Sequence, residues 1–480
     1  MRAERLLLLS VLAGALLVLV RCIPLLATPY QIDYGEGLVL EGALRVRHAQ
    51  ALYPDPFGYP IVLHVYGPVA YAATAAVLPN GNPSFPAGRM LFLGCNVVIA
   101  LLLGVSLRRL TGSWWIGLGC GFLLWTLPAF RFWIYLLRAD VIGMALSAAG
   151  IAIYVWKEKA WYWSVLFFGL AIFCKYSLLA APVAVFIHLI AHRKFKKAAS
   201  FAGALGLACA VAMVVLQERT GNWFAFHMFS THPDRYSLKQ FFALMTLVWA
   251  GAPVATALAV WYVVQDLRGR VRSFPAIYFV VSAITALTAG KLGSTTNHFV
   301  EWMAAMCLCA GLGYTWLQEK FPERALPVAV LLGVSVAAGV AAQNRGDVQP
   351  SRQLAECGQL YQAVKNSPSN SILSQSLGPV LAAGKPVLVS DPFVYGQFEQ
   401  RGLWPNGDIE RRVQGKEFGM ILLASDPSAM KGPDAWAGSL VDAIDKNYRV
   451  VNRFVCRDAG VVLEPRPPDE RLDRPGLLSK

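Results

Sequence analysis

The feature that most constrains this chain is a series of apolar stretches of about the length that crosses a lipid bilayer. A spanning helix needs about 20 mainly apolar residues, and this 480-residue sequence is 56% apolar and only 15% charged. The predicted spans, about eleven by this criterion, are residues 6–26, 89–107, 114–136, 141–156, 161–178, 179–192, 199–216, 241–264, 274–290, 298–316 and 325–342. We therefore expect an all-α polytopic membrane bundle.

The distribution of Lys and Arg predicts the side of the membrane on which each loop lies, because cytoplasmic loops are enriched in these residues. The segment 65–79 is short for a span and contains Gly67-Pro68, which interrupts a helix. If 65–79 does not cross, and the N-terminus is cytoplasmic, the inner loops hold fifteen Lys and Arg and the longer outer loops hold eleven. We therefore expect 65–79 to be a re-entrant or interfacial helix in a first outer loop, 27–88.

The predicted membrane location also indicates the broad class of partner. The net charge is +14, and the basic residues lie between apolar spans, which favours membrane lipid over nucleic acid.

The compact loops, without an organelle-targeting pattern, suit a multi-pass protein of a bacterial inner membrane. The N-terminal MRAER and the apolar run after it also fit a cleaved signal peptide, and both interpretations place 27–88 outside.

A second domain is predicted where the composition becomes polar. We divide the chain into a transmembrane domain over 1–345, a periplasmic α/β domain over 346–465 and a disordered, Pro-rich tail over 466–480. Apolar runs of strand length predict strands, and two stretches between them read as helices. The predicted strands begin at Ser371, Pro386, Met420 and Gly460, and the predicted helices are 352–365 and 434–446. Cys357 and Cys456 are the cysteines of this polar region, where a disulfide between them can form.

The first outer loop carries two carboxylates that could do chemistry. Asp33-Tyr34-Gly35-Glu36 precedes an amphipathic helix that ends in a Pro-rich turn. A carboxylate at this place can act as a general base toward a hydroxyl. Asp33 can equally be the N-cap of the helix that follows. The sequence leaves both roles open.

Further ionisable residues gather at the outer ends of later helices. They are Arg138, Asp140, Lys175, Lys291, Asn297, His298 and Glu301. Ionisable groups at membrane depth are costly and tend to be functional, although a single one can be a snorkelling side chain. Cations beside a carboxylate at one interface favour a lipid-linked phosphate as ligand. The phosphate would be bound by Lys175, Arg138 or Lys291, and the acceptor hydroxyl would be deprotonated by Asp33.

Two other patterns have ordinary structural explanations. His188 and His192 have the i, i+4 spacing of metal ligands, but they adjoin the basic run HRKFKK at the inner face, and we do not predict a metal site there. The series Gly117-x-Gly119-x-Gly121 predicts close helix packing, since no strand precedes it as in a phosphate-binding loop. The sequence contains neither G-x-x-x-x-G-K-[ST] nor Asp-x-Asp, which disfavours ATP-driven work and metal-held nucleotide sugars.

The order of several short motifs resembles that of a known group of enzymes. The motifs are DYGEG (33–37), LYPDP (52–56), YGP (66–68), LRAD (137–140), CKYS (174–177), LGSTTNHFVE (292–301) and LAAGKPVLVSDPF (381–393). In this order they resemble the polytopic glycosyltransferases of the C superfamily (GT-C), which use polyprenyl-phosphate sugars. The group includes rhizobial galacturonosyltransferases, the lipid A aminoarabinose transferase and protein O-mannosyltransferases.

The resemblance implies an inverting transfer of a monosaccharide from a polyprenyl phosphate to a hydroxyl of a periplasmic glycan, lipid or protein. It implies that Asp33 is the catalytic acid of the first outer loop and Glu36 a second one, and their roles could be exchanged. Asp140 matches the second outer-loop acid of the family, within a set that binds the donor. Tyr34 and Tyr66 belong to the acceptor side. The resemblance makes no cofactor certain, and a divalent metal is possible.

Two other functions compete with this interpretation. A transporter of lipid-linked glycans could use the same cations to bind a headgroup without chemistry, but transporters tend to place charges near the midplane of repeated halves. The charges here lie near one face, and no internal repeat is present. A sensor or scaffold whose outer domain binds a ligand or peptide is a third, weaker alternative.

Overall fold

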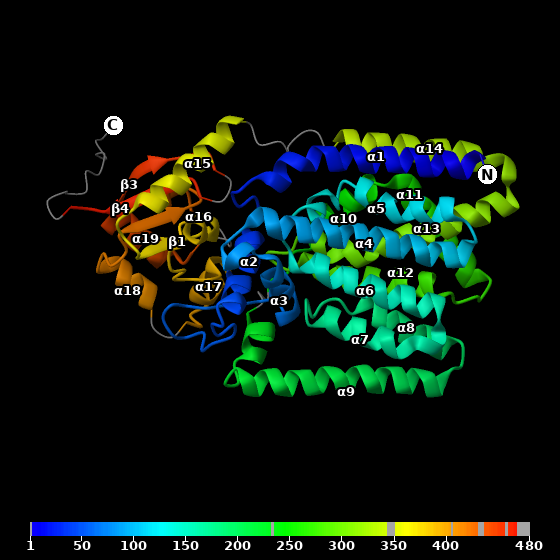
Figure 1. Cartoon of the computed structure of the whole chain (residues 1–480), viewed down its shortest axis with the longest axis horizontal. Coiled ribbons are helices and arrows are strands. Elements are labelled where there is room, and N and C mark those ends of the chain that lie inside the picture. The colour runs from blue at the N-terminus through cyan, green and yellow to red at the C-terminus, as the bar shows by residue number, and fades with distance from the viewer. Residues whose placement is uncertain are drawn as a thin grey trace, which may run out of the picture.

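The computed structural model describes residues 2–231, 235–342, 351–404, 407–430, 436–456 and 459–467. A bundle of long helices leads, at one end, into a small α/β domain (Figure 1). This architecture confirms the predicted fold class of a polytopic helical bundle with a C-terminal α/β domain. The predicted disordered tail covers residues 466–480. Its residues after 467 are not among the described residues.

Fourteen α-helices in the described part of the chain make up the bundle and the loop over 27–88. They are α1 (Arg2–Ala27), α2 (Tyr34–Arg47), α3 (Pro68–Val77), α4 (Phe85–Thr111), α5 (Trp114–Thr126), α6 (Ala139–Trp156), α7 (Trp161–Ile172), α8 (Ala180–Ala191), α9 (Phe195–Arg219), α10 (Leu238–Ala250), α11 (Pro253–Arg268), α12 (Phe274–Thr285), α13 (Val300–Lys320) and α14 (Pro322–Ala342). Of the described helices, six are long and apolar enough to cross a membrane, or seven if the bent pair α10 and α11 is one span. The shorter apolar helices α5, α7, α8 and α12 occupy the remaining predicted spans, and α3 is, as expected, too short to cross.

Two predicted spans differ from the observed helices. The span predicted over 114–136 is wrong at its end, because α5 stops at Thr126 and a short 3-10 turn, η2 (Arg131–Ile134), follows. Pro128 explains the stop, since the residue before a proline is disfavoured in the helical region. The span predicted over 241–264 consists of α10 and α11, which meet at 97°. Pro253 begins α11, where a proline fits the first turn but could not continue the preceding helix.

The glycine series in α5 gives the predicted close helix packing, and two of its glycines face α4. A Cβ at Gly117 would lie 2.6 Å from the carbonyl oxygen of Gly104, and one at Gly121 would lie 2.2 Å from that of Ala100. Only glycine allows the two backbones to approach so closely. The closely packed helices α4 and α5 are part of the apolar core of the bundle.

The α/β domain is built on a four-stranded sheet of order β1-β2-β4-β3. Its strands are β1 (Ile372–Ser374), β2 (Met420–Leu423), β3 (Tyr448–Arg453) and β4 (Val461–Pro465), and its helices are α15 (Ser351–Asn366), α16 (Leu377–Ala382), α17 (Pro392–Gln400), α18 (Asp408–Gln414) and α19 (Gly438–Asn447). β1 and β2 are parallel, while β4 is antiparallel to both β2 and β3. Successive residues of β2 alternate between two apolar clusters, one on each face of the sheet, as the period of a strand requires.

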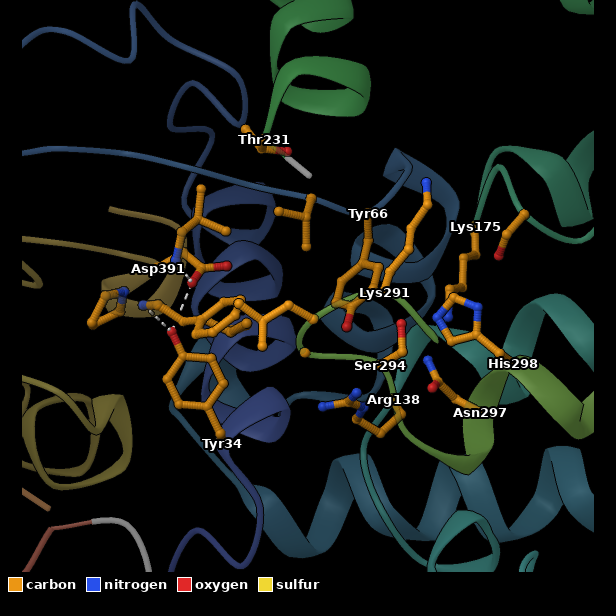
Figure 2. Close-up of a pocket in the computed structure, with 18 of the residues that line it drawn as sticks. Tyr34, Tyr66, Arg138, Lys175, Thr231, Lys291, Ser294, Asn297, His298 and Asp391 are labelled. Carbon is orange, nitrogen blue, oxygen red and sulfur yellow. Dashed lines mark hydrogen bonds between the residues drawn. The ribbon is translucent and has the colours of Figure 1, made fainter. Parts of the chain in front are cut away.

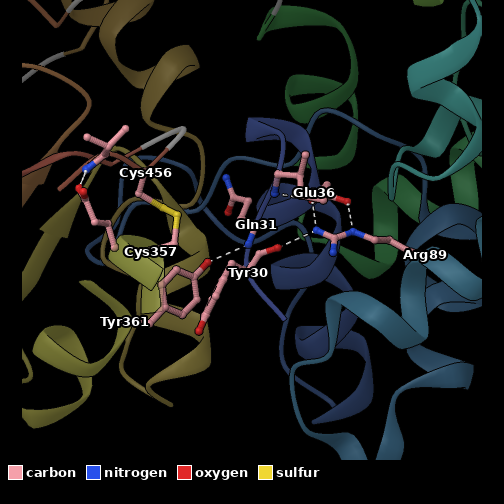
Figure 3. Close-up of a disulfide and its surroundings, with 10 residues drawn as sticks. Tyr30, Gln31, Glu36, Arg89, Cys357, Tyr361 and Cys456 are labelled. Atoms are coloured by element: carbon pink, nitrogen blue, oxygen red, sulfur yellow. Dashed lines mark hydrogen bonds and ion pairs between the residues drawn. A yellow bond between two sulfur atoms is a disulfide. The ribbon is translucent and has the colours of Figure 1, made fainter. Parts of the chain in front are cut away.

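One predicted strand of this domain is wrong. The run that begins at Pro386 forms only an isolated bridge, between Val389 and Ile61 of the first outer loop, so it joins the two domains and does not enter the sheet. The backbone N–H of Ile61 donates to the carbonyl of Leu388, and that of Ser390 donates to the carbonyl of Ile61. The segment β3 was not predicted from the sequence. The disulfide joins Cys357 of α15 to Cys456 after β3 (Figure 3).

Candidate active site

The first outer loop enters α2 through Asp33, which has the extended backbone of an N-cap. Its Oδ1 accepts a hydrogen bond from the Gly35 N–H at 3.0 Å, so the capping role is present. The same oxygen accepts from Nη1 of Arg138 at 2.9 Å, and the Asp33 side chain is 38% exposed. A Cβ at Gly35 would lie 1.7 Å from that Nη1 atom, so this glycine makes room for the arginine. Capping therefore orients Asp33 without burying it.

Glu36 forms a buried ion pair with Arg89. Its side chain is fully buried and is held by Arg89, with Nε donating to Oε1 at 2.8 Å and Nη2 donating to Oε2 at 2.6 Å (Figure 3). The N–H groups of Ile32 and Leu137 donate to the same carboxylate. Glu36 is not among the residues that line the large pocket described below. Through these contacts Glu36 fixes the loop that carries Asp33, and a direct catalytic role for Glu36 stays a prediction.

The ends of three hairpins converge next to this loop. Lys175, between α7 and α8, forms an ion pair with the buried carboxylate of Asp140 in the first turn of α6. Asn297, before α13, donates from Nδ2 to the same Asp140 oxygen at 3.1 Å. Arg138 lies two residues before Asp140 and faces Asp33. Residues that are far apart in the sequence thus form one polar cluster of alternating charge.

The connection between α12 and α13 supplies Lys291 and His298. The Gln240 side chain donates to the carbonyls of Ala289, Lys291 and Ser294, which fixes the backbone of this connection. The Lys291 side chain is exposed, and no ion pair or hydrogen bond of its ammonium group is present within the described part of the chain. Nδ1 of His298 lies 2.7 Å from the Thr288 hydroxyl. Lys291 is therefore a cation available to a ligand.

Glu301 does not join this cluster and is not among the residues that line the pocket. The residue is buried in the first turn of α13. Its carboxylate accepts from the backbone N–H groups of Ala180 and Ala181 at 3.3 and 3.2 Å. These groups open α8, where helix N–H groups lack intrahelical partners. Glu301 therefore caps α8.

A pocket of about 450 Å³ lies between the bundle and the α/β domain. Figure 2 shows Arg138, Lys175, Lys291, Asn297 and His298 on its bundle side, with Tyr66 among them. Asp33 is not itself a lining residue, but its partner Arg138 is. The other polar lining residues are Tyr34, Tyr176, Ser177, Thr231, Thr288, Ser294, Gln375 and Asp391. The pocket thus combines three cations with hydroxyl and amide groups.

The α/β domain completes the pocket through Asp391, which sequence reasoning did not select. Asp391 caps α17 by accepting from the Val394 N–H at 3.0 Å. It also accepts from the Tyr34 hydroxyl at 2.7 Å, and that hydroxyl accepts from the Phe393 N–H at 2.9 Å (Figure 2). The signal was present in the sequence as Asp391-Pro392, a typical N-cap with proline in the first helical position. Tyr34 thereby joins the start of α2 to the second domain.

Burial changes the acidity of this pair. It raises the pKa of Asp391 to about 6, against the lowering effect of the Val394 hydrogen bond. Burial, together with the charge of Asp391, also raises the pKa of the Tyr34 hydroxyl well above its usual value. Burial raises the pKa of Tyr66 to about 12. Both tyrosines therefore remain protonated at neutral pH and can donate hydrogen bonds.

The raised pKa of Asp391 predicts a pH-dependent stability. The folded protein retains a proton on Asp391 that the unfolded chain releases at its ordinary pKa of 3.8, so stability falls as the pH rises from about 4 to about 6. The shift corresponds to about 3 kcal/mol at neutral pH. We expect Asp391→Asn, which keeps an oxygen for Tyr34 and Val394, to raise the Tm at pH 7.5 and to change it little at pH 4. Parallel pH profiles of Tm for the two proteins would contradict this assignment.

Comparison with known proteins supports the fold. No family model and no curated protein matches the sequence. The solved structure of ArnT from Cupriavidus metallidurans in the apo state is similar, with a TM-score of 0.62 and 14% identity over 95% of this chain and 97% of that one. ArnT bound to undecaprenyl phosphate gives a TM-score of 0.61 at 13% identity, with the same shares of the two chains covered.

A second enzyme has a similar structure. The Archaeoglobus fulgidus oligosaccharyltransferase in its apo form has a TM-score of 0.59 and 12% identity over 97% of this chain and 75% of that one. The similarity to both enzymes extends over nearly the whole chain, bundle and α/β domain together. The chain therefore has the GT-C fold that ArnT and this oligosaccharyltransferase share.

Proposed function

We propose that this protein is an integral-membrane, inverting glycosyltransferase that moves a monosaccharide from a polyprenyl phosphate to a hydroxyl of a periplasmic glycan, lipid or protein. The observation that carries the proposal is the pocket in which Arg138, Lys175 and Lys291 gather beside Asp33. Cations suit the phosphate of the donor, and an adjacent carboxylate suits the acceptor hydroxyl. The fold shared with two transferases is consistent with this chemistry.

The proposed reaction needs one base and a set of cations. Asp33 takes the proton of the acceptor hydroxyl as its oxygen attacks the anomeric carbon from the face opposite the phosphate. The bond between that carbon and the phosphate oxygen breaks, and polyprenyl phosphate leaves with the electron pair. Lys175 and Lys291 stabilise the negative charge that develops on the leaving group. A phosphate leaving group needs no strong general acid.

Asp140 and Asn297 act through Lys175 in this proposal. Asp140 forms an ion pair with Lys175 and accepts from Asn297, which fixes the ammonium group in the pocket. Glu36 likewise positions the loop of Asp33 through Arg89. No group of three or more His, Cys, Asp or Glu that could hold a metal occurs in the described ranges. We assign no step of the proposed reaction to a metal.

An apolar groove suggests where the prenyl chain of the donor would lie. It has a volume of about 340 Å³ between α11 and α12, and its lining residues are Val260, Val263, Val264, Phe279, Val280, Ala283, Ile284 and Leu287. Leu287 directly precedes Thr288, which lines the polar pocket. A phosphate in the pocket could therefore continue into a chain that faces the bilayer. Solved structures similar to this one contain undecaprenyl phosphate or dolichol phosphate.

The disulfide supports the proposed orientation in the membrane. Disulfides persist in oxidising compartments such as the bacterial periplasm and are rare in the cytosol. The bond between Cys357 and Cys456 lies in the α/β domain, which forms one wall of the pocket. We therefore place this domain and the pocket on the periplasmic side of a bacterial inner membrane, with the N-terminus in the cytoplasm, as the distribution of Lys and Arg also predicts.

The function can be tested with purified protein in proteoliposomes that contain a polyprenyl-phosphate sugar. We expect release of polyprenyl phosphate to match sugar incorporation into an envelope glycan extract. Mass spectrometry of envelope glycans from a strain that lacks the gene should show which sugar is missing. Movement of the donor headgroup across the membrane without release of polyprenyl phosphate would instead identify a transporter.

Lys291 provides a sharper test of the phosphate site. Because a hydrogen bond to a charged group contributes about 1.5–3 kcal/mol, we expect Lys291→Gln to raise the KM for the donor by about 10- to 100-fold. The Tm should not change, since the side chain is exposed and has no protein partner in the described part of the chain. The matched control is Lys239→Gln, an exposed lysine at the start of α10 that is not a pocket residue. Equal KM values in the two variants would remove Lys291 from the donor site.

A further inference from the structure

A second polar cavity lies at the other end of α6, far from the pocket. It consists of two adjoining cavities, of about 510 and 470 Å³, which share Trp156, Lys157, Ala160 and Tyr162. α6 begins at Ala139, next to the pocket residue Arg138, and ends at Trp156. Its 18 residues span about 27 Å at 1.5 Å per residue, close to the thickness of a bilayer core of about 30 Å. The cavity is therefore at the opposite membrane interface.

The charge around this cavity is strongly positive. Lys157, Lys159 and Lys197 line it, and no acidic side chain does so among the described lining residues. The segments 157–160 and 193–197 together contain six Lys and Arg and one acidic residue, Glu158. The cavity therefore suits an anionic group.

The other lining residues show what kind of molecule carries that group. Trp156, Tyr162 and Trp163 are 43%, 56% and 50% exposed. Large amphipathic rings at this depth belong to the headgroup level of a membrane. The cavity continues along the apolar residues Ala152 and Ile153 of α6, toward the bilayer core. The cavity is lined first by lysines, then by aromatic rings and then by aliphatic side chains. This order matches a ligand with an anionic headgroup and an apolar tail.

We propose that this cavity binds an anionic phospholipid of the cytoplasmic leaflet. Lys157, Lys159 and Lys197 contact its phosphate, and Trp156 and Tyr162 contact the region between the headgroup and the acyl chains. Basic pockets between transmembrane helices on the cytoplasmic side bind lipids of this class. Three connected elements meet at this cavity: the end of α6, the start of α7 and the first turn of α9. A bound lipid would hold α9 against the bundle. This site is separate from the proposed transferase pocket and does not depend on sugar transfer.

The test uses purified full-length protein in neutral detergent, titrated with phosphatidylglycerol or phosphatidylcholine. Native mass spectrometry counts bound lipid, and thermal unfolding measures its effect. For the unmodified protein we expect a stable phosphatidylglycerol adduct and a higher Tm than with phosphatidylcholine. Because each lysine near an anionic headgroup adds to binding, we expect K157Q/K159Q/K197Q to bind phosphatidylglycerol about 100-fold more weakly.

A matched control separates the cavity from the general charge of the inner face. K196Q/R268Q/K320Q removes three exposed charges outside the cavity, and we expect it to bind phosphatidylglycerol like the unmodified protein. Equal loss in both triple variants, or equal binding of the two lipids by the unmodified protein, would overturn the proposal. The same stabilisation by sn-glycerol 3-phosphate, which has no acyl chains, would identify a soluble phosphate site and also overturn it.

Discussion

Replacing Asp33 with asparagine is expected to lower the rate of sugar transfer by about 100- to 10,000-fold, the usual contribution of a positioned general base. Asparagine is as good an N-cap as aspartate, so it can still accept from the Gly35 N–H that Asp33 caps. The start of α2 should therefore be preserved, and the Tm should change little. The measurement is the release of polyprenyl phosphate from a defined donor, with donor binding measured separately.

Asp55 offers a matched control in the same outer loop. Its Oδ1 accepts from the Phe57 N–H at 2.9 Å, a contact that asparagine can also make, and Asp55 is not a pocket residue. We expect Asp55→Asn to retain the activity of the unmodified protein. If Asp33→Asn also retains it, the base lies elsewhere. If Asp33→Asn loses donor binding in proportion to activity, the ion pair with Arg138 matters more than proton transfer.

Much of the bundle could be predicted because hydrophobicity is a local property of the sequence. Each apolar stretch predicts one membrane span. The distribution of Lys and Arg predicts the side of the membrane on which each hairpin ends. The errors arose in segments whose composition is typical of a helix or a strand but whose backbone does not form that element. Residues after Pro128 remain apolar and buried but do not form a regular helix. The run at Pro386 has the composition of a strand but pairs with Ile61 outside the sheet.

A residue of the candidate site could be predicted only where its position in a loop was enough to place it near the other site residues. Arg138, Lys175, Lys291 and Asn297 were expected to meet because all were placed at the same interface, and they line one pocket. The partners of individual carboxylates could not be predicted in this way. Glu36 and Arg89 are 53 residues apart, and Tyr34 and Asp391 are 357 apart. Such contacts depend on how whole helices and loops pack together. A local sequence pattern does not predict that packing.

The second large effect is expected from Arg89, which is fully buried at the start of α4. Its guanidinium uses all five N–H groups: two donate to Glu36, and three donate to the carbonyls of Leu25, Thr28 and Tyr30. Arg89→Met would leave the Glu36 carboxylate buried without its cation, and breaking a buried ion pair by removing one partner costs about 3–5 kcal/mol. We expect a large fall in Tm, with loss of activity as the loop before α2 loosens.

Three further variants show whether the pair with Glu36 is the cause of that loss. Arg89→Met/Glu36→Leu leaves no buried charge, so it should recover part of the Tm lost in Arg89→Met, while activity stays low because the three carbonyls remain unpaired. Glu36→Gln alone should lower the Tm while retaining far more activity than Asp33→Asn, since Glu36 positions the loop and does not move a proton. Arg47→Met, at the exposed end of α2, is the control and should behave like the unmodified protein. A Glu36→Gln variant with an unchanged Tm and the activity of Asp33→Asn would exchange the roles of the two carboxylates.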